Sequence, residues 1–491
     1  MILKDKIAIE PGFQYVIDNI ELMSAAGRRR MLQQEFLTDP DALNKELNRV
    51  ARILNCLNEA ETNQQFNKAI IHLRHQQMQM HDLQGTLNNL RQHVRLEELE
   101  LFEIKSFALL CIETMRSANE LGIADLVAVP DTREVFSLLD PDNTGLPNFY
   151  VYDSYHPDLA DLRRQLKALQ TKQDSGALHG GASSTAGQTN QDDSLELQRQ
   201  INDLFDRQNQ IQQQVIAQLS DKLSAHYSLL QEAHDRMAYT DFLFAKATLA
   251  KSWNLVRPMI RQDNGSSVQQ IWNPRLRHRN EQLGIRYQPV DISLSNGTCL
   301  ITGANMAGKT VLLKTVGILQ MMTQFGLFVP ADKAEITLVD DVVFCIGDEQ
   351  NEMNGLSSFA SEIIKISDAL SRAEKEHLLL LIDEPARTTN PIEGKAIVQA
   401  VADLLDHRSS ITLITTHYSQ LGLPCRRLRV RGFVEGASNE RLTPENINRF
   451  IDYSLLPDDS DDVPQEAMRI ASILQCNTSL LDKAKSYLNF S

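Results

Sequence analysis

Apolar side chains recur at three- and four-residue intervals through the first 150 residues, and glycine is rare there. One such run comprises Leu47, Val50, Ile53, Leu54 and Leu57. This spacing places apolar side chains on one face of an α-helix, so we predict that residues 1–150 form a helical core domain. The Asp39-Pro40 pair predicts a helix start, because an acidic residue followed by proline suits a first turn.

The helical spacing of apolar residues continues on both sides of a polar insertion. Leu159, Leu162 and Leu166 mark one face before it, and Leu197, Ile201 and Leu204 mark another after it. No proline or glycine interrupts residues 195–257, which would allow one helix of about 90 Å. The insertion, residues 174–194, is mostly small and polar, and such a composition buries too little area to offset ordering entropy. We therefore predict a long helical hairpin over 151–265 with a disordered tip at 174–194.

From about residue 290 the sequence pattern changes to one typical of alternating strands and helices. Short apolar runs typical of buried strands occur at 298–302, 342–346, 378–382 and 411–415. Helical stretches alternate with them, which favours a sheet covered by helices. The predicted fold class is therefore multidomain, with an α-helical region and hairpin before an α/β domain. Four domains are expected: a helical core at 1–150, the hairpin at 151–265, the α/β domain at 266–450 and a helical segment at 451–491.

Composition adds limits on partners and location. Acidic residues outnumber basic ones, 64 to 49, for a net charge of −15, which argues against polyanion binding over the whole surface but not against a local basic patch. The six cysteines form no close pair, so neither a zinc site nor a disulfide framework is indicated. No signal core and no run of about 18 apolar residues is present. We expect a cytoplasmic protein without a membrane contact.

The strongest chemical signal is the stretch from Gly303 to Thr310, which fits GxxxxGK[ST] between a strand-like run and a helical run. Backbone amides of such a glycine turn wrap phosphates, and the helix N-terminus adds its positive end. Lys309 would reach the β- and γ-phosphates, and Thr310 would ligate magnesium. The alternative is a chance glycine-rich turn. ATP and Mg²⁺ are thus the expected cofactors, bound by a loop that also contains Ala304, Asn305, Met306, Ala307 and Gly308.

Two later apolar runs end in polar residues. The first ends in Asp383-Glu384, where Asp383 would hold magnesium through water and Glu384 would act as general base. The second leads to His417, which would hydrogen-bond the γ-phosphate. An acidic turn after an ordinary strand and a structural histidine are the alternatives. Between the loop and these runs, Ser357 and Ser358 open a helical stretch, and the residues alone favour a simple helix cap there.

The order and spacing of these motifs resemble the MutS family, a branch of the ABC-type ATPases. The similar segments are GANMAGKT, FGLFVPA, GLSSF, LLLIDEPARTTNPIEG and TTHYSQL. Ala304 and Ala307 replace a proline and a glycine of the usual loop, and Pro385 and Ala386 replace the residues that usually follow the acidic pair. Weaker similarity covers the early helices and residues 470–488, so most of the chain is included.

The resemblance implies a homodimer with composite ATP sites. One subunit would supply the phosphate-binding loop, Asp383, Glu384 and His417, and the signature serines Ser357 and Ser358 of the other would cap the γ-phosphate. ATP binding would close the two ATPase domains and move the helical arms. Residues 451–491 would form a helical dimerisation segment.

The resemblance also implies DNA as a ligand, clamped by the hairpin tip. Mismatch readout is not expected, because lever-like helices begin near residue 17 and the Phe433-Val-Glu435 triplet lies far from the N-terminus. However, residues 156–250 carry nine basic and twelve acidic residues, a poor balance for phosphate contacts. The chain also resembles small MutS-like ATPases that reactivate cobalamin-dependent lysine and ornithine aminomutases. A protein client of that kind is therefore the alternative to DNA.

Overall fold

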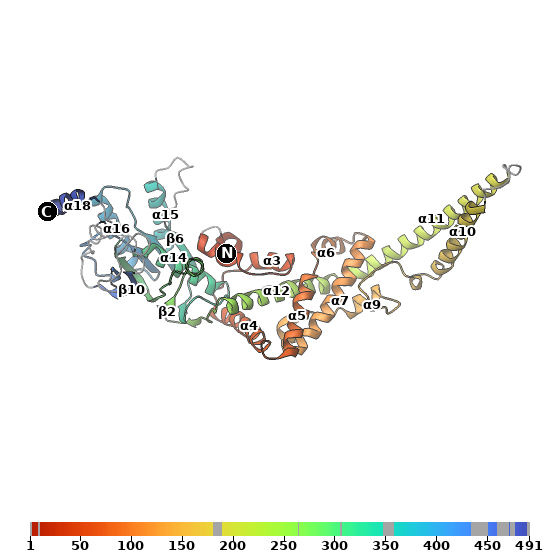
Figure 1. Ribbon diagram of the computed structural model, residues 1–491, viewed down its shortest axis with the longest axis horizontal. Helices are drawn as coiled ribbons and strands as arrows, with labels where there is room; N and C mark the ends of the chain where they lie inside the picture. Colours follow the sequence, from red (N-terminus) through yellow and green to blue (C-terminus); the bar gives the residue numbers. More distant parts are fainter. Residues whose placement is uncertain are drawn as a thin grey trace. The chain divides into compact units, whose positions relative to one another are not determined.

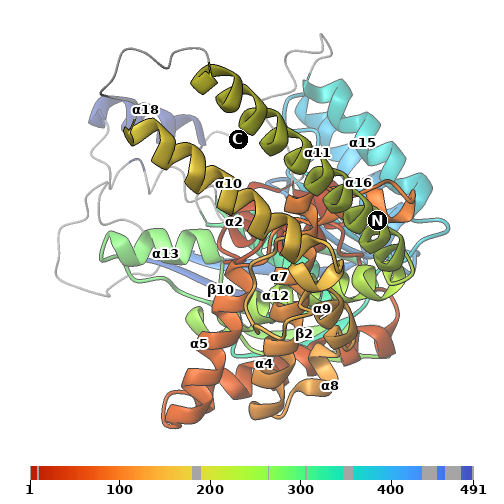
Figure 2. The same cartoon turned by 90° about the vertical axis from the view of Figure 1, so that its right-hand side faces the viewer.

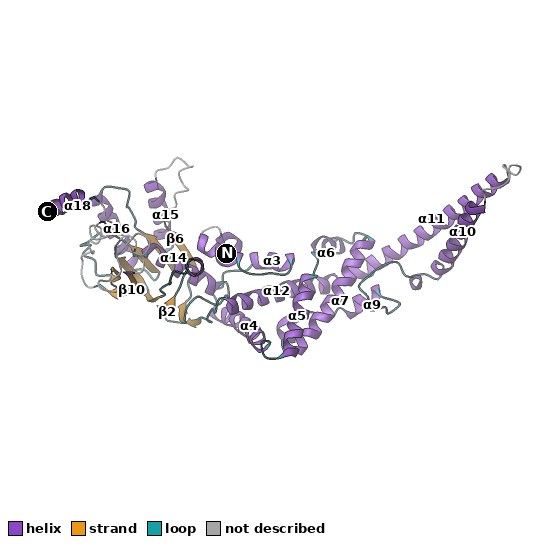
Figure 3. Cartoon of the chain, in the orientation of Figure 1, coloured by secondary structure: helices purple, strands orange, loops and turns teal. Residues whose placement is uncertain are grey.

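The computed structural model describes residues 2–7, 10–179, 189–263, 265–304, 307–346, 358–433, 450–458, 471 and 477–488. The chain divides into two compact units. The helical unit comprises Leu22–Met31 and Cys56–Phe242, and the sheet unit comprises Met1–Glu21, Leu32–Asn55 and Leu243–Ser491. All described strands belong to the sheet unit (Figure 3). Within the described ranges, no helix combines the length and the apolar character needed to cross a membrane.

The helical unit confirms the predicted helical character of the N-terminal region. Its long helix α7 (Glu98–Glu120) contacts α5 (Gln64–Met78) and α9 (Arg133–Leu139). The apolar face of α7 includes Leu101, Ile104 and Phe107, all buried. The remaining short elements are α3 (Ala25–Leu32), α6 (Gln84–Arg91), α8 (Ala124–Val127) and η1 (Asp153–Tyr155).

Helices α10 (Leu159–His179) and α11 (Thr189–Ser224) lie side by side (Figure 1, Figure 2). Leu166 and Ile201 are buried, and Gln173 Nε2 donates to Gln198 Oε1 at 2.7 Å. The backbone is helical up to residue 179 and again from 189, so both ends of the predicted tip lie in helices. Residues 180–188, the rest of that tip, lie outside the described residues.

The single helix expected from 195 to 257 is wrong, because α11 ends at Ser224 and α12 (Tyr227–Ser252) begins after a two-residue turn. The hydroxyls of Ser220 and Ser224 donate to carbonyls four residues earlier, at 2.8 and 2.9 Å. Such bonds slightly destabilise a helix and often bend it. Ser220 Oγ also accepts from the Leu96 amide at 3.0 Å, which ties the last turns of α11 to the segment before α7.

The sheet unit contains a six-stranded sheet of order β10-β9-β4-β8-β7-β6. Its strands are β4 (Gly297–Thr302), β6 (Asp341–Cys345), β7 (Leu378–Asp383), β8 (Ile411–Thr415), β9 (Arg426–Phe433) and β10 (Ile451–Pro457). All neighbouring pairs are parallel except β9 and β10. The four predicted apolar runs are confirmed as β4, β6, β7 and β8.

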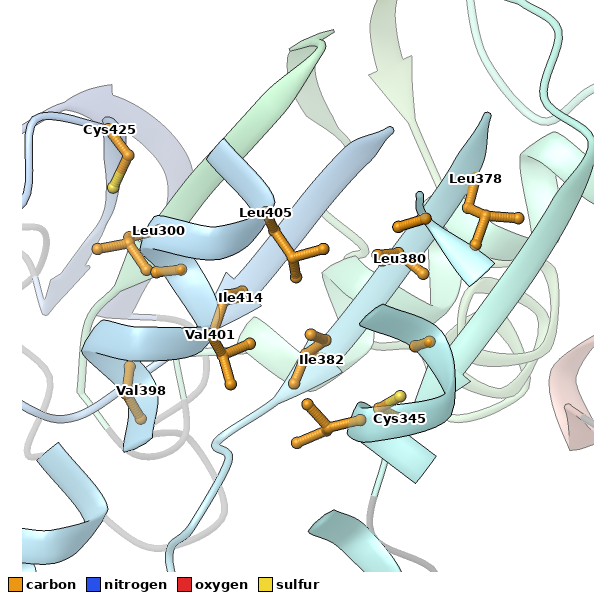
Figure 4. Packing of buried hydrophobic residues seen from close by; sticks show 14 of the residues in the cluster. Leu300, Cys345, Leu378, Leu380, Ile382, Val398, Val401, Leu405, Ile414 and Cys425 are labelled. Carbon is orange, nitrogen blue, oxygen red and sulfur yellow. The ribbon is translucent and has the colours of Figure 1, made fainter. Parts of the chain in front are cut away.

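Helices cover both faces of this sheet. Leu380, Ile382 and Ile414 pack with Val398 and Val401 of α16 (Pro391–Asp406), in a core shown in Figure 4. Residues with the opposite parity face α14 (Lys309–Gln324), which contacts β6, β7 and β8. Helix α15 (Ser358–Arg372) contacts β6 and α16. This two-sided burial explains why the central strands read as continuous apolar runs.

A second sheet of order β1-β5-β2-β3 flanks the first. It consists of β1 (Met259–Arg261), β2 (Gly265–Ile271), β3 (Val290–Ser295) and β5 (Lys333–Thr337). The other helices of the unit are α1 (Leu3–Ile7), α2 (Pro11–Asp18), α13 (Pro274–Gln282) and α18 (Thr478–Leu488), with most of α4 (Pro40–Glu59). The start of α4 is as predicted, since Asp39 carboxylate oxygens accept from the Asp41 and Ala42 amides at 3.3 and 3.1 Å.

The helical segment predicted from residue 451 begins instead with a strand. Residues 451–457 form β10, which pairs with β9 in antiparallel orientation. The strand satisfies backbone groups that β9 would otherwise expose at the sheet edge. The described helix of the C-terminal segment is α18, which begins at Thr478.

Candidate functional site

The turn between β4 and α14 carries the glycine-rich loop at the carboxyl end of the parallel strands. Gly303 has φ 143° and Gly308 has φ 76°, conformations that residues with a Cβ rarely adopt. Gly308 also caps the N-terminus of α14. Asn305 and Met306 lie outside the described residues, and Ala307 is buried. The described part of the loop therefore leads directly into a helix N-terminus, whose positive end favours anions.

Lys309 is the first residue of α14, and its ammonium group turns back over the loop. Nζ donates to the Gly303 carbonyl at 2.7 Å and to the Ala304 carbonyl at 3.2 Å. It also lies 3.3 Å from Glu384 Oε1, and the lysine side chain is only 4% exposed. A buried ammonium group held by carbonyl oxygens is a ready donor for an anion placed against the loop.

Asp383 ends β7 and accepts one hydroxyl on each carboxylate oxygen. Thr310 Oγ1 donates to Oδ2 at 2.7 Å, and Thr415 Oγ1 donates to Oδ1 at 2.6 Å. The three side chains come from α14, β7 and β8. Hydroxyl and carboxylate oxygens are hard ligands of the kind that Mg²⁺ prefers. The donor set at this point therefore fits a magnesium ion.

Glu384 begins a tight turn after β7. Its φ is 43°, and that of Ala386, beyond Pro385, is 59°. The Glu384 amide donates to Thr415 Oγ1 at 2.9 Å and to the Thr415 carbonyl at 3.2 Å. The carboxylate lies between Lys309, at 3.3 Å, and an Arg387 guanidinium nitrogen, at 3.4 Å. The structure thus brings the predicted general base to the predicted phosphate-binding lysine.

His417 follows β8 and is influenced by the same charges. Burial is the largest cause that lowers the pKa of the His417 imidazole, Glu384 opposes it, and Lys309 and Arg387 lower it further. Its ring lies 4.3 Å from the ring of Tyr418, measured between centroids. The net shift favours the neutral imidazole, which can donate one hydrogen bond and accept another.

The structure describes only part of the signature serine pair. Ser357 lies outside the described residues, and Ser358 begins α15 without a described side chain. Their predicted contact therefore stays a prediction. Further along α15, burial raises the pKa of the Glu362 carboxyl, the Ala386 amide lowers it and Asp383 raises it again. Glu362 therefore lies near the acidic turn, a position that the sequence analysis did not predict.

A pocket of about 920 Å³ adjoins the loop on the other side of α14. Its lining includes Gly308, Arg286, Tyr287, Gln288, Phe450 and Tyr453. The Tyr453 ring stands against the loop, since a Cβ on Gly308 would lie 3.2 Å from it. Apolar walls with a few polar groups are typical of small-molecule sites. Sequence reasoning missed this pocket because its walls come from segments more than 160 residues apart, without a short motif.

Sequence comparisons relate this part of the chain to known proteins. Residues 299–437 match the family described as MutS domain V. The protein named endonuclease MutS2 from Agathobacter rectalis is 35% identical over 230 residues, which are 46% of this chain and 28% of that protein. Endonuclease MutS2 from Leuconostoc mesenteroides is 33% identical over 232 residues, 47% of this chain and 28% of the relative.

A third relative, endonuclease MutS2 from Geobacillus thermodenitrificans, is 35% identical over 230 residues, again 46% of this chain and 28% of the relative. The alignments with these three relatives thus cover less than a third of each relative's own length. Together, the matched domain and the relatives support a relationship of this chain to the MutS family, with residues 299–437 corresponding to MutS domain V.

Proposed function

We propose that this chain is a Mg²⁺-dependent ATPase of the MutS type. The observation that carries the proposal is the convergence of Lys309, Thr310, Asp383 and Glu384 at the carboxyl ends of β4 and β7. Lys309 binds the β- and γ-phosphates, while Thr310 and Asp383 hold magnesium, Asp383 through water. Bound magnesium neutralises charge that develops on the phosphates. His417 contacts the γ-phosphate through its neutral imidazole.

The ion pair between Lys309 and Glu384 suggests how the site responds to nucleotide. Without phosphates nearby, the ammonium group is shared between two loop carbonyls and the glutamate. Phosphate oxygens compete for the same ammonium donors, because charge-assisted bonds to phosphate are strong. When Lys309 turns to them, Glu384 is free to orient water and accept its proton.

The pocket beside Gly308 is the proposed place for the nucleoside. Tyr287 and Tyr453 supply aromatic surface, and Gln288 Nε2 is already held by Asp452 Oδ1 at 2.8 Å. Aromatic side chains favour stacked or edge contacts with flat rings. A base in this pocket would leave its phosphates at the N-terminus of α14.

The proposed working unit is a homodimer with composite sites. Ser357 and Ser358 of one subunit contact the γ-phosphate held by the other, and closure moves the helices α10 and α11. Mixed dimers test this arrangement. Lys309→Ala chains combined with Ser357→Ala/Ser358→Ala chains should recover one working site per mixed dimer, and no recovery argues against composite sites.

We propose DNA as the ligand of the helical arms. The support is the similarity to relatives named endonucleases. Two arginines of α10 are already paired with acids: Arg163 with Asp153, and Arg164 with Asp161. Arg199 and Arg207 on α11 are exposed and are the basic residues we assign to phosphate contacts.

A salt titration with linear and branched duplex DNA tests this ligand. Binding should weaken steeply between about 50 and 200 mM salt, because phosphate contacts release counterions. An Arg199→Gln/Arg207→Gln variant should bind more weakly, and the exposed Glu196→Gln serves as the matched control. No binding at low salt contradicts the DNA proposal. The alternative, a cobalamin-dependent aminomutase as protein client, is favoured only by the acidic arms, and no comparison supports it.

ATP binding itself is tested with Lys309→Ala, measured by calorimetry with ATP and Mg²⁺. The wild-type chain should bind ATP, and the variant should lose binding because its phosphate donor is gone. Most of α14 is buried, so a second substitution in that helix would itself disturb the packing. The control therefore lies in another element. Lys333→Ala on β5, an exposed lysine of the same unit, should bind ATP normally.

A further inference from the structure

Thr415, the last residue of β8, is fully buried, and its hydroxyl bonds to both members of the acidic pair. We propose that Thr415 is a positioning residue that fixes the Asp383 carboxylate and the Glu384 backbone together. The inference rests on the proposed ATPase function and deepens it. It assigns a role to a hydroxyl outside the glycine-rich loop and the acidic pair.

The Thr415 hydroxyl acts as a donor and as an acceptor at the same time. Thr415 Oγ1 donates its one hydrogen to Asp383 Oδ1 at 2.6 Å, and a lone pair accepts from the Glu384 amide at 2.9 Å. Thr310 donates to the other Asp383 oxygen at 2.7 Å. Because each oxygen accepts from its own donor, the carboxylate cannot rotate freely. The orientation of both oxygens toward the site is therefore fixed.

Strand register explains why the hydroxyl reaches the turn. Thr415 pairs directly with Asp383 between the parallel strands β8 and β7, so their side chains lie on the same face. The Glu384 amide is then bound by both the hydroxyl and the carbonyl of Thr415. Tyr418 Oη donates to the Ala386 carbonyl at 3.3 Å and holds the far end of the turn.

The turn needs this support because its backbone is strained. Glu384 and Ala386 both have positive φ without being glycine, a state that persists only where the surroundings hold it. Without the Thr415 hydroxyl, one bond to the Glu384 amide and one to Asp383 are lost together. The general base and the carboxylate that would hold magnesium through water would then lose their fixed relation to each other.

The same strand offers a matched control. Thr412 is also fully buried on β8, but its Oγ1 is without a hydrogen-bond partner in the described structure. Thr412→Val therefore removes a hydroxyl from the same strand without breaking a bond. The comparison of Thr415→Val with Thr412→Val isolates the hydrogen bonds of Thr415 from the effect of the substitution on the strand.

The experiment measures kcat, KM for ATP and the Mg²⁺ concentration for half-maximal turnover. Thr415→Val should lower kcat by about 10- to 100-fold or raise the Mg²⁺ requirement by that factor, as expected for a group that orients metal ligands. ATP affinity in the presence of a chelator should stay within about twofold, because the loop is untouched. Thr415→Ser should restore turnover, and Thr412→Val should match the wild type.

The outcomes separate this inference from the proposed function. A wild-type chain that does not hydrolyse ATP overturns the proposed function. A wild-type chain that hydrolyses ATP, with Thr415→Val indistinguishable from Thr412→Val, overturns only the role of Thr415. If Thr415→Val does not fold, Thr415→Ala replaces it in the comparison with Thr415→Ser, and equal kcat in those two variants overturns the role.

Discussion

Gly317 is where the helix that carries Lys309 and Thr310 comes closest to the sheet. It lies in the middle of α14, and a Cβ built there would be 2.4 and 2.5 Å from two carbons of the Phe344 ring. The same atom would be 2.7 Å from Leu381 Cδ1. Phe344 is on β6 and Leu381 on β7, so Gly317→Ala inserts a methyl group between helix and sheet.

The size of the effect follows from these distances. Ordinary contacts of a Cβ begin at 3.4 Å, so the shortest contact is too close by 3.4 − 2.4 = 1.0 Å. Overpacking of a filled core costs about 1–3 kcal/mol, and we take the upper end because the side chains of Phe344 and Leu381 are both too close. The helix preference for alanine over glycine offsets about 1 kcal/mol. The net loss of stability is therefore about 2 kcal/mol.

Relieving these contacts by moving α14 about 1 Å away from the sheet would also move Lys309 and Thr310. Misplacement of that size costs on the order of 100-fold in turnover. Both tryptophans, Trp253 and Trp272, belong to the sheet unit. Tryptophan fluorescence during urea unfolding therefore reports on the unit that contains Gly317, and ATP turnover reports on the site.

Gly85→Ala is the matched control, and its expected effect on stability has the opposite sign. Gly85 lies in α6 of the helical unit, and a Cβ there would meet nothing within 4 Å. The change should stabilise that unit by about 0.5–1 kcal/mol through the unfolded chain, without moving the tryptophan transition. A Gly317→Ala chain with wild-type fluorescence midpoint and wild-type turnover would refute the packing that we describe.

Two further predictions concern charged groups of the sheet unit. Lys6→Met should destabilise the unit by about 3 kcal/mol, since it removes one of the two cations that pair with the buried Asp341 and leaves Arg372 as the remaining ion-pair partner. Urea unfolding followed by tryptophan fluorescence measures the change, and an unchanged midpoint would count against the buried pair. Because the pKa of His417 is lowered, the folded protein binds a proton at this imidazole less readily than the unfolded chain does. The contribution of His417 to stability is therefore complete above about pH 6.5 and is lost as the pH falls below that value. His417→Asn should therefore flatten the decline in unfolding free energy between about pH 7 and 5, and an unaltered slope would show that other groups cause the decline.

Local patterns were enough to predict the parts of the fold that depend on neighbouring residues. The central strands were visible as apolar runs, and the acidic pair was placed correctly at the end of one of them, β7. Thr310 and Asp383 were each predicted to hold magnesium, and the structure brings the Thr310 hydroxyl to 2.7 Å from an Asp383 carboxylate oxygen. These features depend on burial and on short spacing, which a sequence displays directly.

Features that depend on register or on distant segments were beyond the sequence. The bridge from Thr415 to Glu384 requires the exact pairing of β7 with β8, and the pocket requires Tyr287 and Tyr453 to meet beside Gly308. The helix break after Ser224 coincides with hydroxyl bonds from Ser220 and Ser224 to the helix backbone, which the sequence does not display. In each case the feature depends on a residue of another element or on the conformation that a side chain adopts.

The central claim is that Glu384 activates water against ATP held by the loop from Gly303 to Thr310. The most direct test is single-turnover hydrolysis of ATP by the Glu384→Gln variant beside a measurement of ATP affinity. We predict that the variant binds ATP with wild-type affinity and hydrolyses it about 100- to 10,000-fold more slowly, as expected for loss of a general base. Turnover at the wild-type rate would contradict the account, because the base would then be another group.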